Sequence, residues 1–248
     1  MGKPIIFVSH AAVDSSVAKL FKEDVERNFL GLCELFVSSD LGSIQGGDEW
    51  IKNIQKNLND AVMSIGLYSP VALSRPWIYA EFGAGWIRGI PTISLCHSGL
   101  RKDDLPVPLS HFQALDLVDE FHLKHLYEQI AQAVGCQLPS INYTQESQKY
   151  RSITEEKRVK RNIDNWFKNL TSWNPELSKE LNNSNKSGDV LIPSQFESDF
   201  FNFKKESEDL GFLHFTANGM AMGTRVGAQA SVWSVSKGES FDCLIAEQ

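Results

Sequence analysis

The sequence contains few cysteines, and none of them belongs to a recognisable motif. The four cysteines are scattered singly, with no C-x-x-C pair among them: Cys33, Cys96, Cys136 and Cys243. Single cysteines argue against a disulfide framework and against a zinc knuckle. We therefore expect a reduced, cytoplasmic protein without a metal site.

Long apolar runs are also missing. No stretch approaches the roughly 20 residues that a membrane-spanning helix needs. The first ten residues (MGKPIIFVSH) hold an apolar stretch of only four residues, which predicts no secretory signal. We therefore expect no membrane contact.

An excess of basic charge is absent too. The chain has 24 lysines and arginines against 31 aspartates and glutamates, which gives a net charge of −7. A negative protein does not attract the phosphates of nucleic acid over a broad surface, so nucleic acid is disfavoured as a partner. Hydrophobic residues make up 42% of the chain, an ordinary share for a globular protein, and this excludes wholesale disorder.

Short apolar runs alternate with amphipathic stretches over residues 1–140. The runs that predict buried strands lie at residues 5–9, 35–38, 61–68 and 91–95. They are continuous and too short to be buried helices. Helical spacing predicts a helix capped by Asp14, and further helices at about 50–58, 77–88 and 121–134. Strands that alternate with helices predict an α/β fold whose parallel sheet is covered on both faces.

Residues 141–248 have a different texture and are expected to form a second, smaller α+β domain. A polar linker is predicted over residues 141–165, and it passes into a helix that continues to about residue 182. Ser194 is expected to cap a helix over residues 194–209. Strands separated by glycine-containing segments are predicted at 212–216, 228–235 and 241–246.

One pair of side chains stands out as a candidate for chemistry. Pro76 suits the first turn of a helix, and it leaves Trp77 and Glu81 four residues apart on one helix face. Parallel sheets bind ligands beyond the carboxyl ends of their strands, so an indole and a carboxylate would point into such a site together. The alternative is structural, with Trp77 in the core and Glu81 in solvent.

Five short motifs follow one another along the first part of the chain. They are Ile6–His10 (IFVSH) with Asp14, Leu35–Asp40 (LFVSSD) with the loop Ser43–Trp50 (SIQGGDEW), Leu67–Pro70 (LYSP), Trp77–Glu81 (WIYAE) and Gly89–Ile93 (GIPTI). In this order and spacing they resemble the bacterial Toll/interleukin-receptor (TIR) domain over about residues 3–138. The resemblance implies a flavodoxin-like, five-stranded parallel sheet, which agrees with the pattern of strands and helices.

The resemblance also implies an activity. In enzymatic TIR domains the glutamate of the Trp-x-x-x-Glu motif cleaves NAD at the nicotinamide–ribose bond, and the matching residues here are Glu81 and Trp77. Nicotinamide leaves NAD without needing a proton, and the positive charge that develops on the ribose can be stabilised by one carboxylate. The Trp77 ring can stack on nicotinamide or adenine. Attack by water gives ADP-ribose, and attack by the adenine gives a cyclic isomer; NAD is then the substrate and no separate cofactor is expected.

The same resemblance places further residues beside the substrate: Ser9, His10, Ser38, Asp40 and Trp50. Ser9 either donates to a phosphate or ribose hydroxyl or simply closes its strand, and Asp40 either holds the ribose or caps the loop. The segment matching the BB loop consists of Ser43, Ile44, Gln45, Gly46 and Gly47. In relatives this loop moves and contacts a neighbouring subunit; the two glycines suit that movement or an ordinary static loop.

The implied partners are other copies of the chain, joined through their TIR domains. The resemblance suggests bacterial anti-phage defence, with residues 141–248 sensing an unknown ligand or protein or driving assembly. One alternative is a non-enzymatic adaptor that recruits other TIR domains, although the intact Trp77–Glu81 pair favours an enzyme. Another is an enzyme similar to nucleoside deoxyribosyltransferases, which use a glutamate on a related sheet. His122 and His125 are expected to be surface residues rather than metal ligands.

Overall fold

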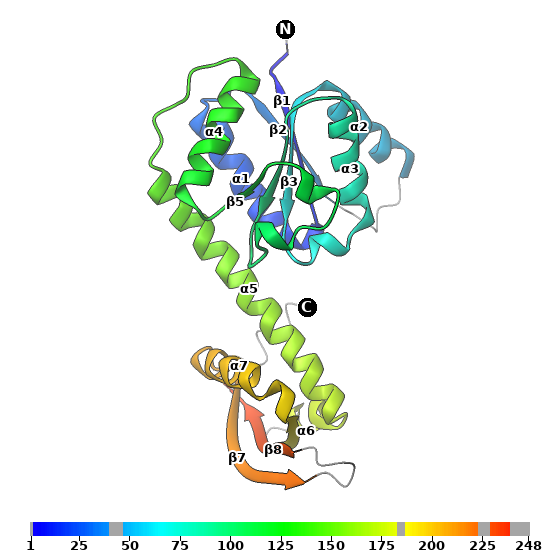
Figure 1. The fold of residues 1–248 in the computed structure, drawn as a ribbon, viewed down its shortest axis with the longest axis vertical. Coiled ribbons are helices and arrows are strands. Elements are labelled where there is room, and N and C mark those ends of the chain that lie inside the picture. Colours follow the sequence, from blue (N-terminus) through cyan, green and yellow to red (C-terminus); the bar gives the residue numbers. More distant parts are fainter. Residues whose placement is uncertain (1, 40–46, 183–186, 223–228, 239–248) are drawn as a thin grey trace. The chain divides into compact units, whose positions relative to one another are not determined.

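The computed structural model describes residues 2–39, 47–182, 187–222 and 229–238 (Figure 1). The chain divides into two compact units, Met1–Glu156 and Lys157–Gln248, whereas the sequence pattern divides it near residue 140. Helix α5 (Tyr143–Trp173) is continuous over 31 residues and belongs in part to each unit. Most of the segment that was predicted to be a polar linker is therefore helical. Its few apolar residues are widely spaced and pack in two different cores.

The first unit is built on an all-parallel sheet. Its strands are β1 (Ile5–His10), β2 (Glu34–Ser39), β3 (Ala61–Tyr68), β4 (Thr92–Cys96) and β5 (Ala114–Asp116). They lie in the order β2-β1-β3-β4-β5, which is the order of flavodoxin-like doubly wound sheets. The predicted α/β fold with a five-stranded parallel sheet is confirmed. The apolar pattern misses only β5, whose three residues are too few to show a period.

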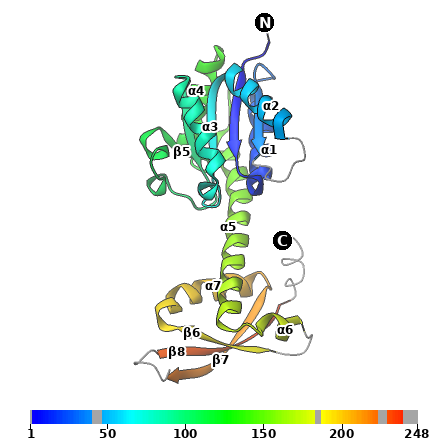
Figure 2. The same ribbon diagram turned by 90° about the vertical axis from the view of Figure 1, so that its right-hand side faces the viewer.

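Helices cover both faces of this sheet (Figures 1 and 2). Helices α1 (Ser15–Asn28) and α4 (Glu120–Val134) lie on one face, and α2 (Gly47–Asp60) and α3 (Pro76–Ile87) lie on the other. Side chains of β1 alternate between the two: Ile6 and Val8 pack in the core with α1 and α4, and Phe7 packs in the core with α2. Because of this alternation, each residue at the end of the strand points to only one face of the sheet.

Helix α3 packs closely against the sheet at Gly85. A Cβ atom added there would lie 3.0 Å from Ser64 Cβ and 3.1 Å from Thr92 Oγ1, so glycine lets the helix sit close to β3 and β4. An added Cβ at Gly83 would meet nothing within 4 Å. Pro76 stands in the first turn of α3, as predicted. The helix thus presents Trp77 and Glu81 from its first turns.

Asp14 has a different role from the predicted helix cap. It occupies the N-cap position of α1, but its side chain makes no capping hydrogen bond. Ser69 Oγ instead donates to Asp14 Oδ2 at 2.6 Å, across 55 positions of sequence. Both residues are buried, so this contact joins the loop after β1 to the loop after β3.

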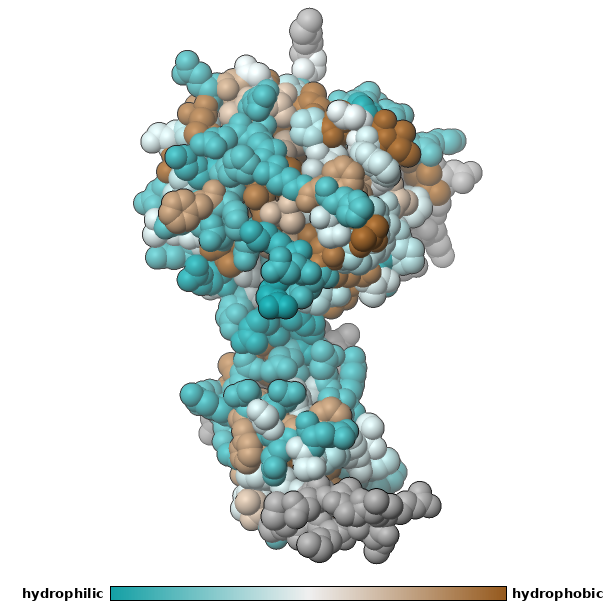
Figure 3. All heavy atoms as spheres, viewed as in Figure 1, coloured by the Kyte–Doolittle hydropathy of each residue, from teal (hydrophilic) through white to brown (hydrophobic). Residues whose placement is uncertain are grey.

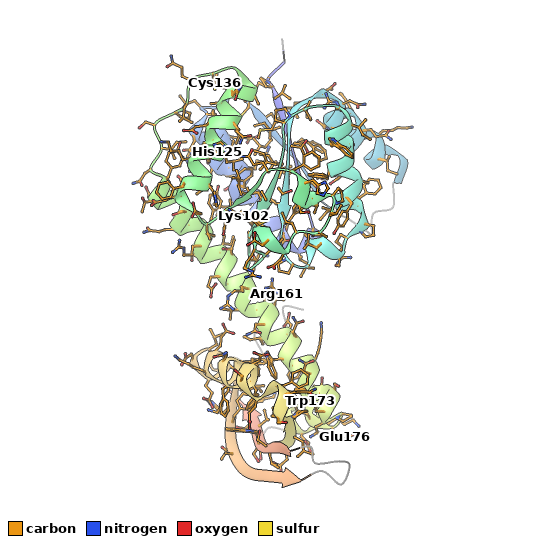
Figure 4. All side chains as sticks on the ribbon, in the orientation of Figure 1. Lys102, His125, Cys136, Arg161, Trp173 and Glu176 are labelled. Atoms are coloured by element: carbon orange, nitrogen blue, oxygen red, sulfur yellow. The ribbon has the colours of Figure 1, made fainter. Side chains whose placement is uncertain are left out.

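The second unit has a small α+β fold. Its antiparallel sheet has the order β6-β8-β7, and its elements are α6 (Leu177–Asn182), β6 (Gly188–Pro193), α7 (Glu197–Asp209), β7 (Leu213–Met222) and β8 (Gln229–Lys237). The core is rich in aromatic rings, with Trp166 stacked on Phe203 at 5.1 Å and packed edge-on against Trp173 at 6.1 Å. Figure 4 labels Trp173. The sequence pattern misses β6, because its alternating residues follow a polar segment directly. The strand predicted at 241–246 lies outside the described residues.

Short 3₁₀ turns complete the described chain: Ala12–Asp14, Ala72–Ser74, Lys102–Asp104, Leu109–His111 and Ser194–Phe196. Ser194 therefore begins a turn that leads into α7 at Glu197.

Within the part of the chain that the structure describes, no helix combines the length and the apolar character needed to cross a bilayer. On the face seen in Figure 3, hydrophobic and hydrophilic residues of the first unit are intermixed.

Candidate functional site

Three hydrogen-bond donors converge on the carboxylate of Glu81. Ser9 and Ser38 are register partners near the carboxyl ends of β1 and β2, and Glu81 reaches them from the second turn of α3. Glu81 Oε1 accepts from Ser38 Oγ at 2.9 Å and from Trp77 Nε1 at 2.9 Å. Glu81 Oε2 accepts from Ser9 Oγ. The structure thus brings together four of the predicted site residues, from two strands and one helix.

Hydrogen bonds from three donors favour the ionised form of this carboxylate. Glu81 is 4% exposed, and a buried carboxylate is costly unless hydrogen bonds stabilise it. Hydrogen bonds to an ionised acceptor are stronger than those between neutral groups. The alternative that put Glu81 in solvent is therefore wrong. Trp77 is half-buried and packs against the cluster that contains Phe7 and Ile54.

Tyr68 belongs to the Leu67–Pro70 motif but not to the predicted site residues, and it lies close to this carboxylate. Its ring folds back over Gly66, where an added Cβ would lie 2.1 Å from the phenol oxygen. Gly66 is the register partner of Ser9 on β1 and of Ser94 on β4. Burial, and to a lesser extent the charge of Glu81, raise the pKa of Tyr68 well above its usual value. The Gly-x-Tyr spacing was the available signal, since residues two apart share one face of a strand.

His10 faces the other side of the sheet. Successive residues of a strand point to opposite faces, so the strand that directs Ser9 toward Glu81 directs His10 toward α1. His10 lines a pocket of about 550 Å³ together with residues of α1 and β2, namely Ser15, Ser16, Lys19, Lys22 and Val37. Burial lowers the pKa of His10 to about 4, against a smaller opposing effect of a hydrogen bond with the backbone of Ser38. The imidazole is therefore neutral at pH 7 and is not part of the Glu81 cluster.

Several predicted site residues cannot be placed around Glu81. Asp40, Ser43, Ile44, Gln45 and Gly46 lie outside the described residues. Gly47 is the first residue of α2, and Trp50 lies in the first turn of that helix, but its side chain is outside the described part of the chain. Their assignments to the substrate pocket and to the BB loop stay predictions.

The two histidines of α4 have ordinary contacts. The Asp116 backbone N–H donates to His122 Nδ1 at 3.2 Å, which ties α4 to β5. His125, labelled in Figure 4, is exposed and lies 2.9 Å from Gln129 Nε2. Within the described residues, no three or more His, Cys, Asp or Glu side chains form a group that could hold a metal ion.

No protein-family model matches the chain, and the search of curated proteins returns no match.

The Glu81 cluster is chemically suited to stabilise positive charge on a ligand. A carboxylate that already accepts three hydrogen bonds is placed to act as an anion rather than as a proton donor. The hydroxyls of Ser9 and Ser38 can each rotate, and each can both donate and accept. A ligand hydroxyl can therefore enter this network by taking the place of one serine on Glu81.

Proposed function

We propose that the protein is an NAD glycohydrolase of the TIR type, which cleaves the nicotinamide–ribose bond of NAD. The observation that carries this proposal is the buried Glu81 carboxylate, bound by Ser9, Ser38 and Trp77 beside the carboxyl ends of two neighbouring parallel strands, β1 and the edge strand β2. Doubly wound sheets bind nucleotides beyond the carboxyl ends of their strands, at the point where the connections that follow two neighbouring strands, here β1 and β3, run to opposite faces of the sheet. The resemblance to the TIR motifs suggests the reaction, and the Glu81 carboxylate provides the negative charge that this reaction needs beside the ribose.

The chemistry assigns a role to each group. The bond between ribose C1′ and the nicotinamide nitrogen breaks, its electron pair goes to that nitrogen, and nicotinamide leaves as a neutral molecule. Positive charge then collects on C1′ and the ribose ring oxygen, where the Glu81 carboxylate stabilises it. Water adds to C1′ and releases a proton to give ADP-ribose; attack by the adenine of the same molecule gives a cyclic isomer instead.

Ser9, Ser38 and Trp77 orient the carboxylate before substrate arrives. When the ribose binds, its hydroxyls donate to Glu81, and the serine hydroxyls that they displace turn to accept from or donate to the same sugar. The Trp77 ring stays next to Glu81 through their shared helix face and offers an aromatic surface to nicotinamide or adenine. This stacking is the feature through which Trp77 influences the ratio of linear to cyclic product.

The proposal extends to assembly and setting. TIR domains of the enzymatic type complete their pocket with the BB loop of a neighbour, so we expect activity to rise with self-association. A cytoplasmic role in anti-phage defence follows from the same resemblance. The second unit would then respond to a trigger, either a ligand or a protein, or drive assembly.

A product assay tests the proposed function. Purified protein is incubated over a range of protein concentrations with NAD and, separately, with deoxyadenosine, and the products are separated by chromatography. We expect nicotinamide with ADP-ribose or its cyclic isomer from the wild type, and none from Glu81→Gln. Glu128→Gln is the matched control, because Glu128 is a partly exposed glutamate of α4 that pairs with Lys124 and His125.

The possible outcomes separate the competing functions. NAD cleavage by a folded Glu81→Gln protein at the wild-type rate would remove Glu81 from the mechanism. Release of adenine from deoxyadenosine, with NAD untouched, would identify the enzyme similar to deoxyribosyltransferases. Loss of neither substrate at any protein concentration would contradict both enzymes and leave the TIR adaptor.

A further inference from the structure

A row of small residues crosses the sheet beneath helix α3. It consists of one residue from each of the neighbouring strands β2, β1, β3 and β4, paired in register: Ser38, Ser9, Gly66 and Ser94. The two serines of β2 and β1 point toward α3, because both donate to Glu81. The other two positions face the same helix, since Ser64 and Thr92, two residues earlier on β3 and β4, meet Gly85 of α3.

The phenol of Tyr68 fills the one place in this row that has no side chain. A Cβ atom added at Gly66 would lie 2.1 Å from both Cζ and Oη of Tyr68, so the phenol oxygen stands where a side chain of Gly66 would begin. Neighbouring strands of a sheet lie about 4.8 Å apart. The phenol oxygen therefore stands about one strand spacing from the side chains of Ser9 and Ser94, which flank Gly66 in the row.

This phenol has no hydrogen-bond partner in the part of the chain that the structure describes, although Tyr68 is fully buried. Burial raises the pKa of Tyr68 far above its usual value, so the phenol keeps its proton at neutral pH and can both donate and accept. Buried polar groups nearly always have a partner, and an unpaired one costs free energy. The hydroxyl of Tyr68 therefore points to a partner that it meets in another state of the site.

Ser9 is the residue of the row that has a reason to change its partner. Its hydroxyl donates to Glu81 Oε2, and it gives up this bond when a ligand hydroxyl donates to the same oxygen. A serine side chain has three staggered rotamers, and rotation away from Glu81 can bring Oγ toward Gly66 and the phenol. Ser38 lies one strand further from Gly66 and has a different second acceptor, the Val8 carbonyl oxygen at 3.5 Å.

We propose that Tyr68 is a positioning residue, which binds the Ser9 hydroxyl when a ligand hydroxyl replaces it on Glu81. Tyr68 then donates to Ser9 Oγ, and Ser9 donates to the ligand, so that each hydroxyl keeps a partner while the carboxylate turns to the ligand. The identity of that ligand, the ribose of NAD, rests on the proposed function. The change of partner itself requires only a donor that takes the place of Ser9 on Glu81.

Double-mutant cycles on NAD turnover by the full chain test this role. Tyr68→Phe keeps the buried ring and is expected to lower kcat/KM by about 3- to 10-fold, the factor that corresponds to one neutral hydrogen bond. In a Ser9→Ala background the same change should have an effect of less than about twofold, because the partner is gone. In a Ser38→Ala background the full factor should remain. Tyr150→Phe is the matched control, since Tyr150 is equally buried but packs in the core on the other face of the sheet.

A second cycle needs no substrate, and it separates a failure of this proposal from a failure of the proposed function. In Glu81→Gln a side-chain amide N–H stands in place of Oε2, so Ser9 has to donate its proton to another group. Tyr68→Phe should leave the melting temperature of the wild type unchanged or raise it. The same change should lower the melting temperature of Glu81→Gln by about 2–4 °C, the fall that corresponds to one hydrogen bond in a unit of this size.

The outcomes also decide which neighbour in the row the phenol serves. Coupling between Tyr68→Phe and Glu81→Gln in scanning calorimetry, with no NAD cleavage by the wild type, would support the change of partner and remove NAD as the ligand. The proposal is overturned if Tyr68→Phe changes the melting temperature equally in the wild type and in Glu81→Gln, or changes turnover equally with and without Ser9. It is also overturned if the effect on turnover disappears in Ser94→Ala instead, which would make Tyr68 a structural partner of Ser94.

Discussion

The contrast between Glu81→Gln and Glu81→Ala tests the hydrogen-bond network of the candidate site directly. A glutamine side chain can keep all three contacts of the carboxylate. Its amide oxygen, placed at Oε1, accepts from Ser38 and Trp77, and its amide N–H donates to Ser9 Oγ, which reverses its own role. The bonds become neutral ones and are weaker, but the cost of burying a charge also disappears. We expect a change of at most about 1 kcal/mol in the free energy of unfolding.

An alanine at this position leaves the same donors without their acceptor. Ser38 Oγ can turn to the Val8 carbonyl oxygen, which is already 3.5 Å away, and the half-buried Trp77 can meet water. Ser9 is 2% exposed and loses its acceptor in the core, at a cost of roughly 1–3 kcal/mol. The cavity left by the side chain adds to this, so we expect a loss of about 2–4 kcal/mol in total. For a unit of this size that is a fall of roughly 4–16 °C in melting temperature.

Scanning calorimetry of the wild type and both variants measures the difference, with Glu128→Gln as the control for a change of charge. The transition of the first unit should move little in Glu81→Gln and fall clearly in Glu81→Ala, while NAD turnover is lost in both by at least about 100-fold. Equal destabilisation by glutamine and alanine would show that Ser9, Ser38 and Trp77 do not hold the carboxylate as described.

Four further expectations concern residues of this sheet and of helix α3. Burial lowers the pKa of His10 to about 4, below the 6.5 of an unfolded histidine, so the unfolded chain binds more protons between these pH values. The free energy of unfolding should therefore fall by up to about 3 kcal/mol as the pH drops from 6.5 to 4. Urea titrations of His10→Gln should show a flatter dependence of the free energy of unfolding on pH. Tyr68→Phe should leave the free energy of unfolding unchanged or raise it by about 1 kcal/mol, because the phenol has no hydrogen-bond partner among the described residues. Gly66→Ala should lower the free energy of unfolding, measured by chemical denaturation, by at least about 1–3 kcal/mol, since the new Cβ would lie 2.1 Å from that phenol. Trp77→Phe keeps an aromatic face but removes the donor to Glu81, so chromatography should find an altered ratio of linear to cyclic product.

The fold of the first unit could be predicted because its sheet is buried on both faces. Strands of such a sheet are continuous apolar runs, and the helices between them carry apolar residues at helical spacing. The second unit was harder to predict, since its strands are half-buried and alternate, and β6 (Gly188–Pro193) follows a polar segment that hides its start.

Single polar residues could be predicted less well, because their partners are distant in sequence. Asp14 has the local signature of a helix cap, but Ser69 takes its carboxylate. Gly83 and Gly85 look alike in sequence, and only Gly85 meets the sheet. Ser9 and His10 were assigned to one ligand site, although the two-residue period of a strand already places them on opposite faces.

The buried carboxylates differ in the kind of partner that holds them, and this difference separates the structural carboxylates from the candidate functional one. Asp24 and Glu146 are paired with cations: Arg27 bonds to Asp24 and lies 3.3 Å from Glu146, and Lys149 lies 3.0 Å from Glu146. Those charges neutralise each other and have little effect on a ligand. The partners that the structure describes for Glu81 include two hydroxyls and an indole, which orient its carboxylate. A carboxylate oriented in this way beside the carboxyl ends of β1 and β2 is placed to stabilise a positively charged transition state. This is the physical reason for assigning the proposed catalysis to Glu81 rather than to Asp24 or Glu146, which are paired with cations.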